Sequence, residues 1–206
     1  MADLDPRNKN QKLSGSPGEI LKAYTNLIVT GLGHISEETL QAVIQTLEQC
    51  AKEGGVAYVV GNGGSSAIGE HLCCDWTKGT HCAGSATIKT MSLTSNVALL
   101  TALSNDFGFE VGLSKQIEYF VTKRDVLLAI SSSGNSENII NAVVAAKERG
   151  VRVIGFTGFS GGRLKELADY SFHVPIQHYG AVEDAHQMLM HTIAQAVYEK
   201  RRGGPP

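Results

Sequence analysis

The sequence predicts an α/β protein with a central, mostly parallel sheet that is flanked by helices. Five short runs rich in Val, Ile and Leu are typical of strands, at residues 56–60, 87–93, 125–130, 151–156 and 171–174. Helical segments separate them, at about 65–78, 96–104, 108–122, 136–149, 161–168 and 183–201. Strands that alternate with helices favour right-handed crossovers, which place helices on both faces of the sheet. We therefore expect a five-stranded sheet in a three-layer arrangement.

Two amphipathic helices are expected before the first strand. Apolar residues recur at helical spacing within 18–32 and again within 36–52, on either side of a break at Gly33. Their apolar faces must pack on the domain, on a partner subunit, or on both. We expect one domain over residues 18–200, preceded by a loose arm (1–17) and followed by a frayed tail (201–206).

The composition is that of an ordinary globular protein of 206 residues, with 42% hydrophobic and 18% charged residues. Eighteen basic and twenty acidic residues give a net charge of −2 without a basic stripe, so nucleic-acid binding has no electrostatic support. The longest apolar runs have only the length of a strand, so we expect no membrane span. The polar N-terminus lacks the apolar core of a signal peptide, which predicts a cytoplasmic location.

The four cysteines are Cys50, Cys73, Cys74 and Cys82, and none forms a C-x-x-C pair. We expect reduced thiols, as is usual in the cytoplasm. A zinc role for Cys73 or Cys74 stays open because His71 and Asp75 flank them, although both thiols more naturally face the core from a helix.

A serine-rich loop follows the third expected strand and opens a helix: Ser131-Ser132-Ser133-Gly134-Asn135-Ser136. Its hydroxyls and the free N–H groups of the helix start can together surround an anion, most plausibly a phosphate. The loop contains no lysine, which separates it from the nucleotide P-loop. A serine-rich cap and turn without a ligand is the alternative interpretation.

A second loop of the same kind, Gly61-Asn62-Gly63-Gly64-Ser65-Ser66, follows the first expected strand. Ligands of parallel sheets bind at the carboxyl ends of the strands, at a topological switch point. Two such loops at strand ends therefore predict one sugar-phosphate pocket.

Acidic residues and histidines gather on two of the expected helices. His71 and Asp75 share a helical face at positions i and i+4 and could share a metal or a proton, or form only a local hydrogen bond. On the last helix, Glu183 and His191 differ by about 80° around the axis, with Gln187 between them. Asp184 aligns with His191 even more closely, so the spacing does not choose between the two acids.

The apolar neighbours of His191 predict that its imidazole is partly buried. Asn105 and Asp106 are expected in a turn between two helices, where capping alone could explain Asp106. Trp76 and Tyr179 could line a pocket, but packing in a core or an interface is favoured for both.

Together these motifs resemble the phosphoheptose isomerases of the sugar-isomerase (SIS) superfamily, over roughly residues 20–200. The resemblance depends on five segments: 61–65, 104–109, 125–128, 131–136 and 155–158. It implies the three-layer SIS fold and a homotetramer with the N-terminal helices in the subunit interfaces. It also implies active sites that are built from neighbouring subunits.

The resemblance implies a role for each candidate residue. The phosphate would be held by Ser65, Ser131, Ser133 and Ser136, and Asn62 and Asp106 would contact the sugar. The wider substrate site would include Gly63, Gly64, Asn105, Ser132 and Glu183. A metal, usually zinc, would be bound by His71, Asp75, Glu183 and His191. Asp75 would be the catalytic base and His191 its acid–base partner.

The reaction that the resemblance implies converts D-sedoheptulose 7-phosphate to D-glycero-D-manno-heptose 7-phosphate through an enediol, for heptose biosynthesis. Two positions depart from the family, which has glutamate where this chain has Asp75 and glutamine where it has Glu183. A base misplaced by about 1 Å can cost about a hundredfold in rate, unless the backbone shifts to compensate. The additional carboxylate would bind a cation more tightly and weaken its Lewis acidity.

Two alternatives stay open. One is an isomerase or lyase of the same fold that acts on a different sugar phosphate. The other is a non-catalytic SIS tetramer that binds the replication initiator DnaA, against which the set of acids and histidines argues.

Overall fold

The core of the protein is a five-stranded sheet in which all neighbouring strands are parallel. The structure, a computed structural model, describes residues 10–203. Its strands are β1 (Val56–Gly61), β2 (Lys89–Ser92), β3 (Val126–Ser131), β4 (Arg152–Thr157) and β5 (Tyr170–His173). They lie in the order β2-β1-β3-β4-β5. The predicted fold class is confirmed, and each strand begins and ends within two residues of its expected position.

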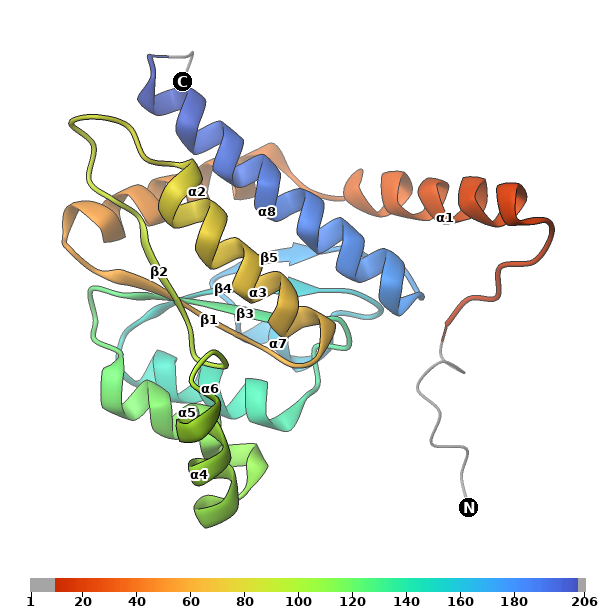
Figure 1. Ribbon diagram of the computed structural model, residues 1–206. Helices are drawn as coiled ribbons and strands as arrows, with labels where there is room; N and C mark the ends of the chain where they lie inside the picture. The colour runs from red at the N-terminus through yellow and green to blue at the C-terminus, as the bar shows by residue number, and fades with distance from the viewer. Residues whose placement is uncertain (1–9, 204–206) are drawn as a thin grey trace.

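Helices cover both faces of the sheet, as Figure 1 shows. On one face lie α2 (Glu37–Lys52), α3 (Gly64–Cys74) and α8 (Tyr179–Arg201). On the other face lie α4 (Val97–Phe107), α5 (Phe109–Phe120), α6 (Glu137–Glu148) and α7 (Gly162–Leu167). The remaining helix, α1 (Pro17–Leu32), projects to one side of the sheet, beside the first turns of α8.

Successive side chains of the central strands point to opposite faces of the sheet and so contribute to two hydrophobic clusters. In β3, Val126, Leu128 and Ile130 pack beneath α2, α3 and α8, whereas Leu127 and Ala129 pack against α5 and α6. All five residues are at most 3% exposed. Because both faces of the strand are covered, every position is apolar and the sequence shows an unbroken run instead of an alternating one.

Three helical segments differ from the prediction, and one of them is α8, which begins at Tyr179 and not at about 183. α4 continues to Phe107, so Asn105 and Asp106 lie in its last turn and not in a turn between two helices. The helix after β1 changes type at Asp75, where a π turn (Asp75–Gly79) replaces the α-helical pattern. Single π turns of this kind occur frequently at functional sites.

The two ends of the chain contact the domain more closely than expected. Residues 1–9 and 204–206 of the expected arm and tail lie outside the described part. Asn10 accepts a hydrogen bond from the Tyr179 amide at 2.8 Å, and the Gln11 amide donates to the Gln177 carbonyl at 2.5 Å. Arg201, expected to begin the frayed tail, instead ends α8 with its side chain 4% exposed. Its guanidinium bonds the Glu48 carboxylate and the carbonyls of Thr80 and Ala86, which fixes this helix end.

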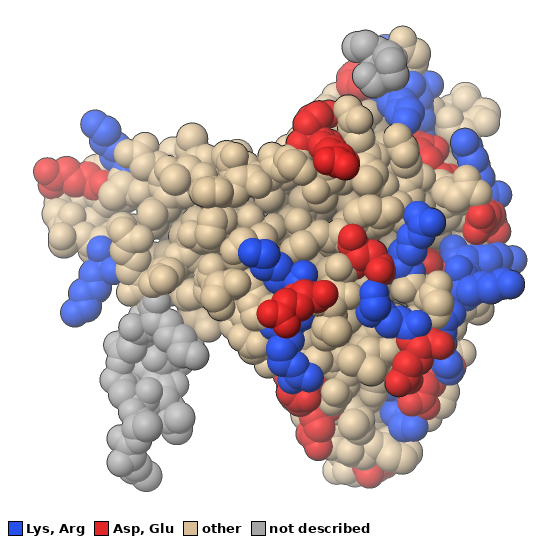
Figure 2. All heavy atoms as spheres, turned by 180° about the vertical axis from the view of Figure 1, so that it is seen from behind, with Lys and Arg blue, Asp and Glu red and all other residues tan. Residues whose placement is uncertain are grey.

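Acidic and basic side chains are interspersed on the face that Figure 2 shows, and the projecting α1 is largely uncharged there. Within residues 10–203, every helix is too short or too polar to cross a lipid bilayer.

Candidate functional site

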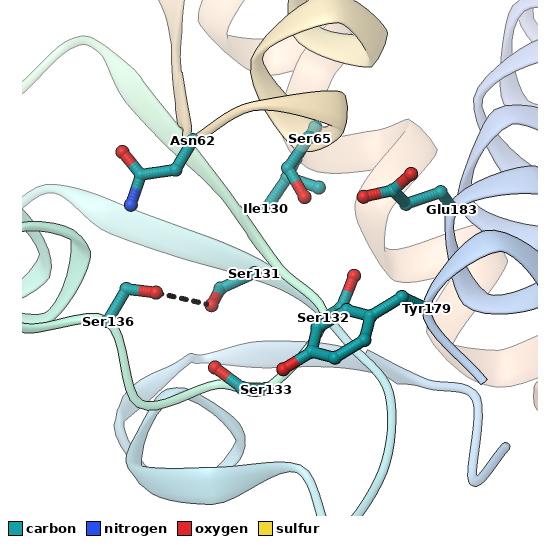
Figure 3. A pocket seen from close by; sticks show the side chains of 9 residues that line it. All are labelled: Asn62, Ser65, Ile130, Ser131, Ser132, Ser133, Ser136, Tyr179 and Glu183. Carbon is teal, nitrogen blue, oxygen red and sulfur yellow. Dashed lines mark hydrogen bonds between the residues drawn. The ribbon is translucent and has the colours of Figure 1, made fainter. Parts of the chain in front are cut away.

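The serine-rich loop and the glycine-rich loop meet at one pocket (Figure 3). They follow β3 and β1, which are neighbours, and the chain leaves these strands toward opposite edges of the sheet. This is the topological switch point at which parallel sheets bind ligands. The cavity of about 160 Å³, roughly the volume of five water molecules, is lined by Asn62, Ser65, Ile130, Ser131, Ser132, Ser133, Ser136, Tyr179 and Glu183.

Two helices begin at the pocket without a side-chain cap. α3 follows Gly63, whose φ of 52° is in the left-handed region that favours glycine, and α6 follows Ser136. Neither position makes the side-chain hydrogen bond with which Ser16, Ser36 and Asn96 cap α1, α2 and α4. The positive ends of α3 and α6 are therefore left for an anion.

Three hydroxyls of the serine-rich loop differ in their hydrogen bonding. Ser131 Oγ accepts from the Gly134 amide at 3.2 Å and lies 3.5 Å from Ser136 Oγ, which shapes the loop. Ser132 Oγ is buried and has no partner among the described residues. A buried hydroxyl without a partner is costly, and this one belongs to a residue that lines the cavity. The hydrogen-bonding capacity of Ser132 Oγ is thus not used by any described residue.

Glu183 lines the pocket beside the glycine-rich loop. A Cβ on Gly64 would lie 2.5 Å from Glu183 Oε1, so only glycine leaves room for this carboxylate. Burial raises the pKa of Glu183, and the nearby Asp184 carboxylate adds to the shift. Asp184 itself accepts a hydrogen bond from the Tyr24 hydroxyl at 2.5 Å. Of the two acids that helical spacing could not separate, Glu183 therefore faces the pocket and Asp184 anchors α1.

Tyr179, which lines the pocket, and Asn138, which bonds the lining residue Asn62, were not among the predicted site residues. Asn138 exchanges a pair of hydrogen bonds with Asn62, at 2.9 and 2.8 Å, and so fixes the side chain that was expected to contact the sugar. Tyr179 lines the pocket and also packs on Phe159 with 4.7 Å between ring centroids, although packing alone was favoured for it. A position at the start of α8 was the sequence signal for Tyr179, whereas Asn138 offered none.

Farther along α3 and α8, His71, Asp75 and His191 form a cluster. Asp75 Oδ2 lies 3.0 Å from His191 Nε2 and 3.4 Å from His71 Nε2. The side chain of His191 is 48% exposed, so about half of it is buried, where it packs against the His71 ring and lies beside Asp75. The buried histidine of α8 is His186, which is fully enclosed against Phe156.

The cluster fits the predicted metal. One nitrogen from each histidine and one oxygen from Asp75 lie within 4.8 Å of one another. Two imidazoles and a carboxylate are a donor set that suits zinc, and their exposure leaves room for substrate. Glu183 is not part of this cluster, since its carboxylate lies beside Gly64 in the pocket. Its role as a metal ligand stays a prediction.

The remaining candidates lie away from the cluster. Cys73 is partly buried, and burial raises its thiol pKa to about 11; Cys74 is exposed and so does not face the core as expected. Neither cysteine belongs to the ligand cluster. Asn105 donates a hydrogen bond to Asp106 at 3.0 Å, and both side chains are exposed on α4, outside the pocket of this chain.

α3 and α8 both extend from the pocket to the cluster of His71, Asp75 and His191. Both helices begin at the pocket, where Gly64 adjoins Glu183, and run in the same direction until Asp75 adjoins His191. His71 follows Gly64 by seven residues, which corresponds to two turns or about 10 Å along α3. An anion in the pocket would therefore present the rest of its molecule to a carboxylate–imidazole pair.

Comparison with known proteins agrees with this geometry. The SIS domain family matches residues 23–158. A phosphoheptose isomerase of Campylobacter concisus is 35% identical over 165 residues, which span 80% of this chain and 87% of that protein. Another, of Rhodospirillum rubrum, is 38% identical over 146 residues, or 71% and 77% of the two chains.

Solved structures give the same result. The phosphoheptose isomerase of Neisseria gonorrhoeae superimposes with a TM-score of 0.79 at 30% identity, covering 87% of this chain and 97% of that one. The phosphoheptose isomerase of Francisella tularensis has a TM-score of 0.81 at 26% identity, covering 90% and 100%. The chain thus belongs to the phosphoheptose isomerase family of SIS domain proteins.

Proposed function

We propose that this protein is an isomerase that converts D-sedoheptulose 7-phosphate to D-glycero-D-manno-heptose 7-phosphate. The observation that carries the proposal is the position of the Asp75–His191 pair on the two helices that begin at the anion pocket, with Asp75 about three turns along α3 from Gly64 and His191 about two turns along α8 from Glu183. The named relatives, which are phosphoheptose isomerases, supply the substrate class.

In this proposal the pocket holds the phosphate. Ser65, Ser131, Ser133 and Ser136 supply hydroxyls, and the uncapped starts of α3 and α6 supply N–H groups and the positive ends of two helix dipoles. Ser132 adds a hydroxyl that has no other partner. Asn62, held by Asn138, faces the sugar, and Gly63 and Gly64 let the backbone approach it closely.

The chemistry is a proton transfer between two neighbouring carbons. The Asp75 carboxylate removes the proton from the hydroxyl-bearing carbon next to the carbonyl, and the C–H electron pair forms the double bond of an enediol. His191 gives a proton to the former carbonyl oxygen and receives one from the neighbouring hydroxyl. Asp75 then returns its proton to the other carbon, so the atoms and charges balance.

A divalent metal, in the first place zinc, completes the proposed site. His71, Asp75 and His191 would hold it, with Glu183 as the fourth ligand if its side chain turns from the pocket toward the cluster. When bound, the ion would polarise the two substrate oxygens and favour loss of the carbon-bound proton.

The proposal includes a homotetramer. α1 exposes Leu21 and Val29, 67% and 63% exposed, on a projecting helix that is largely uncharged in Figure 2. Phe107 and Phe109 are also exposed and flank the α4–α5 corner that carries Asn105 and Asp106. Burial of these surfaces between subunits would bring Asn105 and Asp106 to a sugar site that one chain leaves incomplete. We also propose a cytoplasmic location, to which four unpaired cysteines are suited.

The test incubates the purified protein with sedoheptulose 7-phosphate and follows the aldose product by NMR, with and without chelator and with zinc restored. We expect turnover that chelator abolishes and zinc restores, and that drops at least a hundredfold in Asp75→Asn and His191→Ala. Parallel incubations with ketohexose 6-phosphates test a different sugar. If both variants turn over as fast as wild type, the catalytic assignment of Asp75 and His191 is wrong. If the wild-type protein converts none of these sugar phosphates, a binding role is favoured.

A further inference from the structure

Gln187 contacts the acid–histidine cluster although no motif points to it. It lies on α8, one turn before His191, and its side chain is half-buried. Its amide nitrogen lies 2.7 Å from Nδ1 of His71 and 3.5 Å from Nε2 of His191, and a half-turn of the amide group would place its oxygen there instead. One side chain of α8 thus reaches both histidines, including the one on α3.

The two nitrogens of the His71 ring face different partners. Nε2 faces Asp75 Oδ2 at 3.4 Å, on the side where the three ligand atoms converge, and Nδ1 faces the Gln187 amide. The two imidazole rings stand edge to face, with 5.0 Å between their centroids. His71 is therefore held from both edges of its ring.

These contacts connect the Gln187 amide to the proton on the His71 ring. A neutral imidazole carries one N–H, so a proton on Nδ1 leaves Nε2 with a free electron pair for a metal, and a proton on Nε2 removes it. A proton on Nδ1 needs an acceptor, which the amide oxygen of Gln187 supplies. When the proton is on Nε2, the Nε2–H group points to the Asp75 carboxylate, and the amide nitrogen of Gln187 donates a hydrogen bond to Nδ1.

We propose that Gln187 is a positioning residue that selects the His71 tautomer and thereby readies Nε2 of His71 for the metal. The inference depends on the metal site of the proposed function and extends it to a residue that is not itself a ligand. Hydrogen bonds to the remote nitrogen of a ligating histidine fix its orientation and raise its basicity. An amide suits this position because its oxygen can accept a hydrogen bond from His71 when the metal is bound, and its nitrogen can donate one to His71 when the metal is absent.

Three substitutions separate this role from a merely structural one. Gln187→Met keeps the length of the side chain but removes both hydrogen-bonding groups. Gln187→Glu keeps the acceptor alone, which favours the proton on Nδ1. Gln195→Met is the matched control, because Gln195 is an exposed glutamine two turns along the same helix that bonds only Glu199.

The zinc affinity of the full-length protein, measured by competition with a chromophoric chelator at neutral pH, is the main readout. We expect Gln187→Met to bind zinc 10–100-fold more weakly, Gln187→Glu to bind at least as tightly as wild type, and Gln195→Met to be unchanged. Nitrogen NMR of the zinc-free protein, with the ring assigned through His71→Gln, should show the His71 tautomer populations shift in Gln187→Met. Unfolding temperatures of the zinc-free variants show that each remains folded.

Wild-type zinc affinity in Gln187→Met would overturn the inference, as would an equal loss in Gln187→Glu, which would show that a hydrogen-bond acceptor at position 187 does not set the affinity. A wild-type protein that binds no zinc would overturn it too. A protein that binds zinc through Gln187 but isomerises no heptose phosphate would instead contradict the proposed function and leave the inference intact.

Discussion

The indole N–H of Trp76 donates a hydrogen bond to the main-chain carbonyl of Met190, with 3.0 Å between nitrogen and oxygen. Each residue directly neighbours a proposed catalytic residue, Asp75 in the first case and His191 in the second. Trp76 is 1% exposed, as expected of a core residue, so this bond is shielded from water. It fixes the registry of α8 against the π turn that carries Asp75, and so the separation of the base from its partner.

Trp76→Phe should therefore lower kcat as well as stability. The unpaired carbonyl should cost about 1–3 kcal/mol of unfolding free energy, and a displacement of about 1 Å at Asp75 should cost up to about a hundredfold in kcat. Tyr58→Phe is the control, because it removes another bond from an aromatic donor to a main-chain carbonyl, at Phe120 and away from the site. Urea unfolding and steady-state kinetics of both variants check this, and equal kcat values would contradict it.

Restoring the glutamate of the family at position 75 should not raise the rate. Asp75 already reaches His191 Nε2 at 3.0 Å from the π turn. One more methylene adds about 1.5 Å, so the carboxylate of Asp75→Glu must move past this contact. We expect a lower kcat and a nearly unchanged KM, since the phosphate pocket is untouched. A variant faster than wild type would show that the backbone does not compensate for the shorter side chain.

Ser132→Ala should separate ligand binding from folding. Because Ser132 Oγ is buried without a partner, its removal should leave the free energy of unfolding unchanged or slightly higher. The same change should raise KM for the sugar phosphate about fivefold to tenfold, which corresponds to the loss of about one hydrogen bond. Chemical unfolding and kinetics give the two numbers. A loss of stability without a change in KM would assign the hydroxyl to the fold.

Acid should destabilise the protein through His186. This ring is fully buried, and burial lowers its pKa from 6.5 to about 4. Between these values the unfolded chain binds a proton that the folded chain does not, so stability falls as the pH drops from 6.5 to 4, by roughly 3 kcal/mol at the end of that range. His186→Leu should flatten this part of the pH profile, whereas His81→Gln, at an exposed site, should not. Parallel profiles in all three proteins would exclude His186 as the cause.

The sequence predicted the elements well because buried parallel strands leave unbroken apolar runs and the two pocket loops carry their own signals. It could not decide contacts that depend on other elements. Helical spacing leaves both Glu183 and Asp184 within reach of the side of α8 that carries His191, and only the position of Tyr24 on α1 assigns Asp184 to an anchor and Glu183 to the pocket. Apolar neighbours predicted a partly buried His191, but its 48% exposure depends on α3 and the turn after it, which contribute His71 and Asp75. The Gln187 contact requires the distance between α3 and α8, which no local pattern contains.

The parallel course of α3 and α8 also sets a fixed distance between the phosphate pocket and Asp75. A phosphate in the loops would fix one end of the substrate, and the roughly three turns of α3 from Gly64 to Asp75 would determine which carbon comes level with that carboxylate. Selection among sugar phosphates would then depend on the length of the carbon chain as well as on its hydroxyl groups. A shorter sugar with the same phosphate would occupy the loops and still leave its carbonyl short of the base, so it would inhibit the enzyme without being converted.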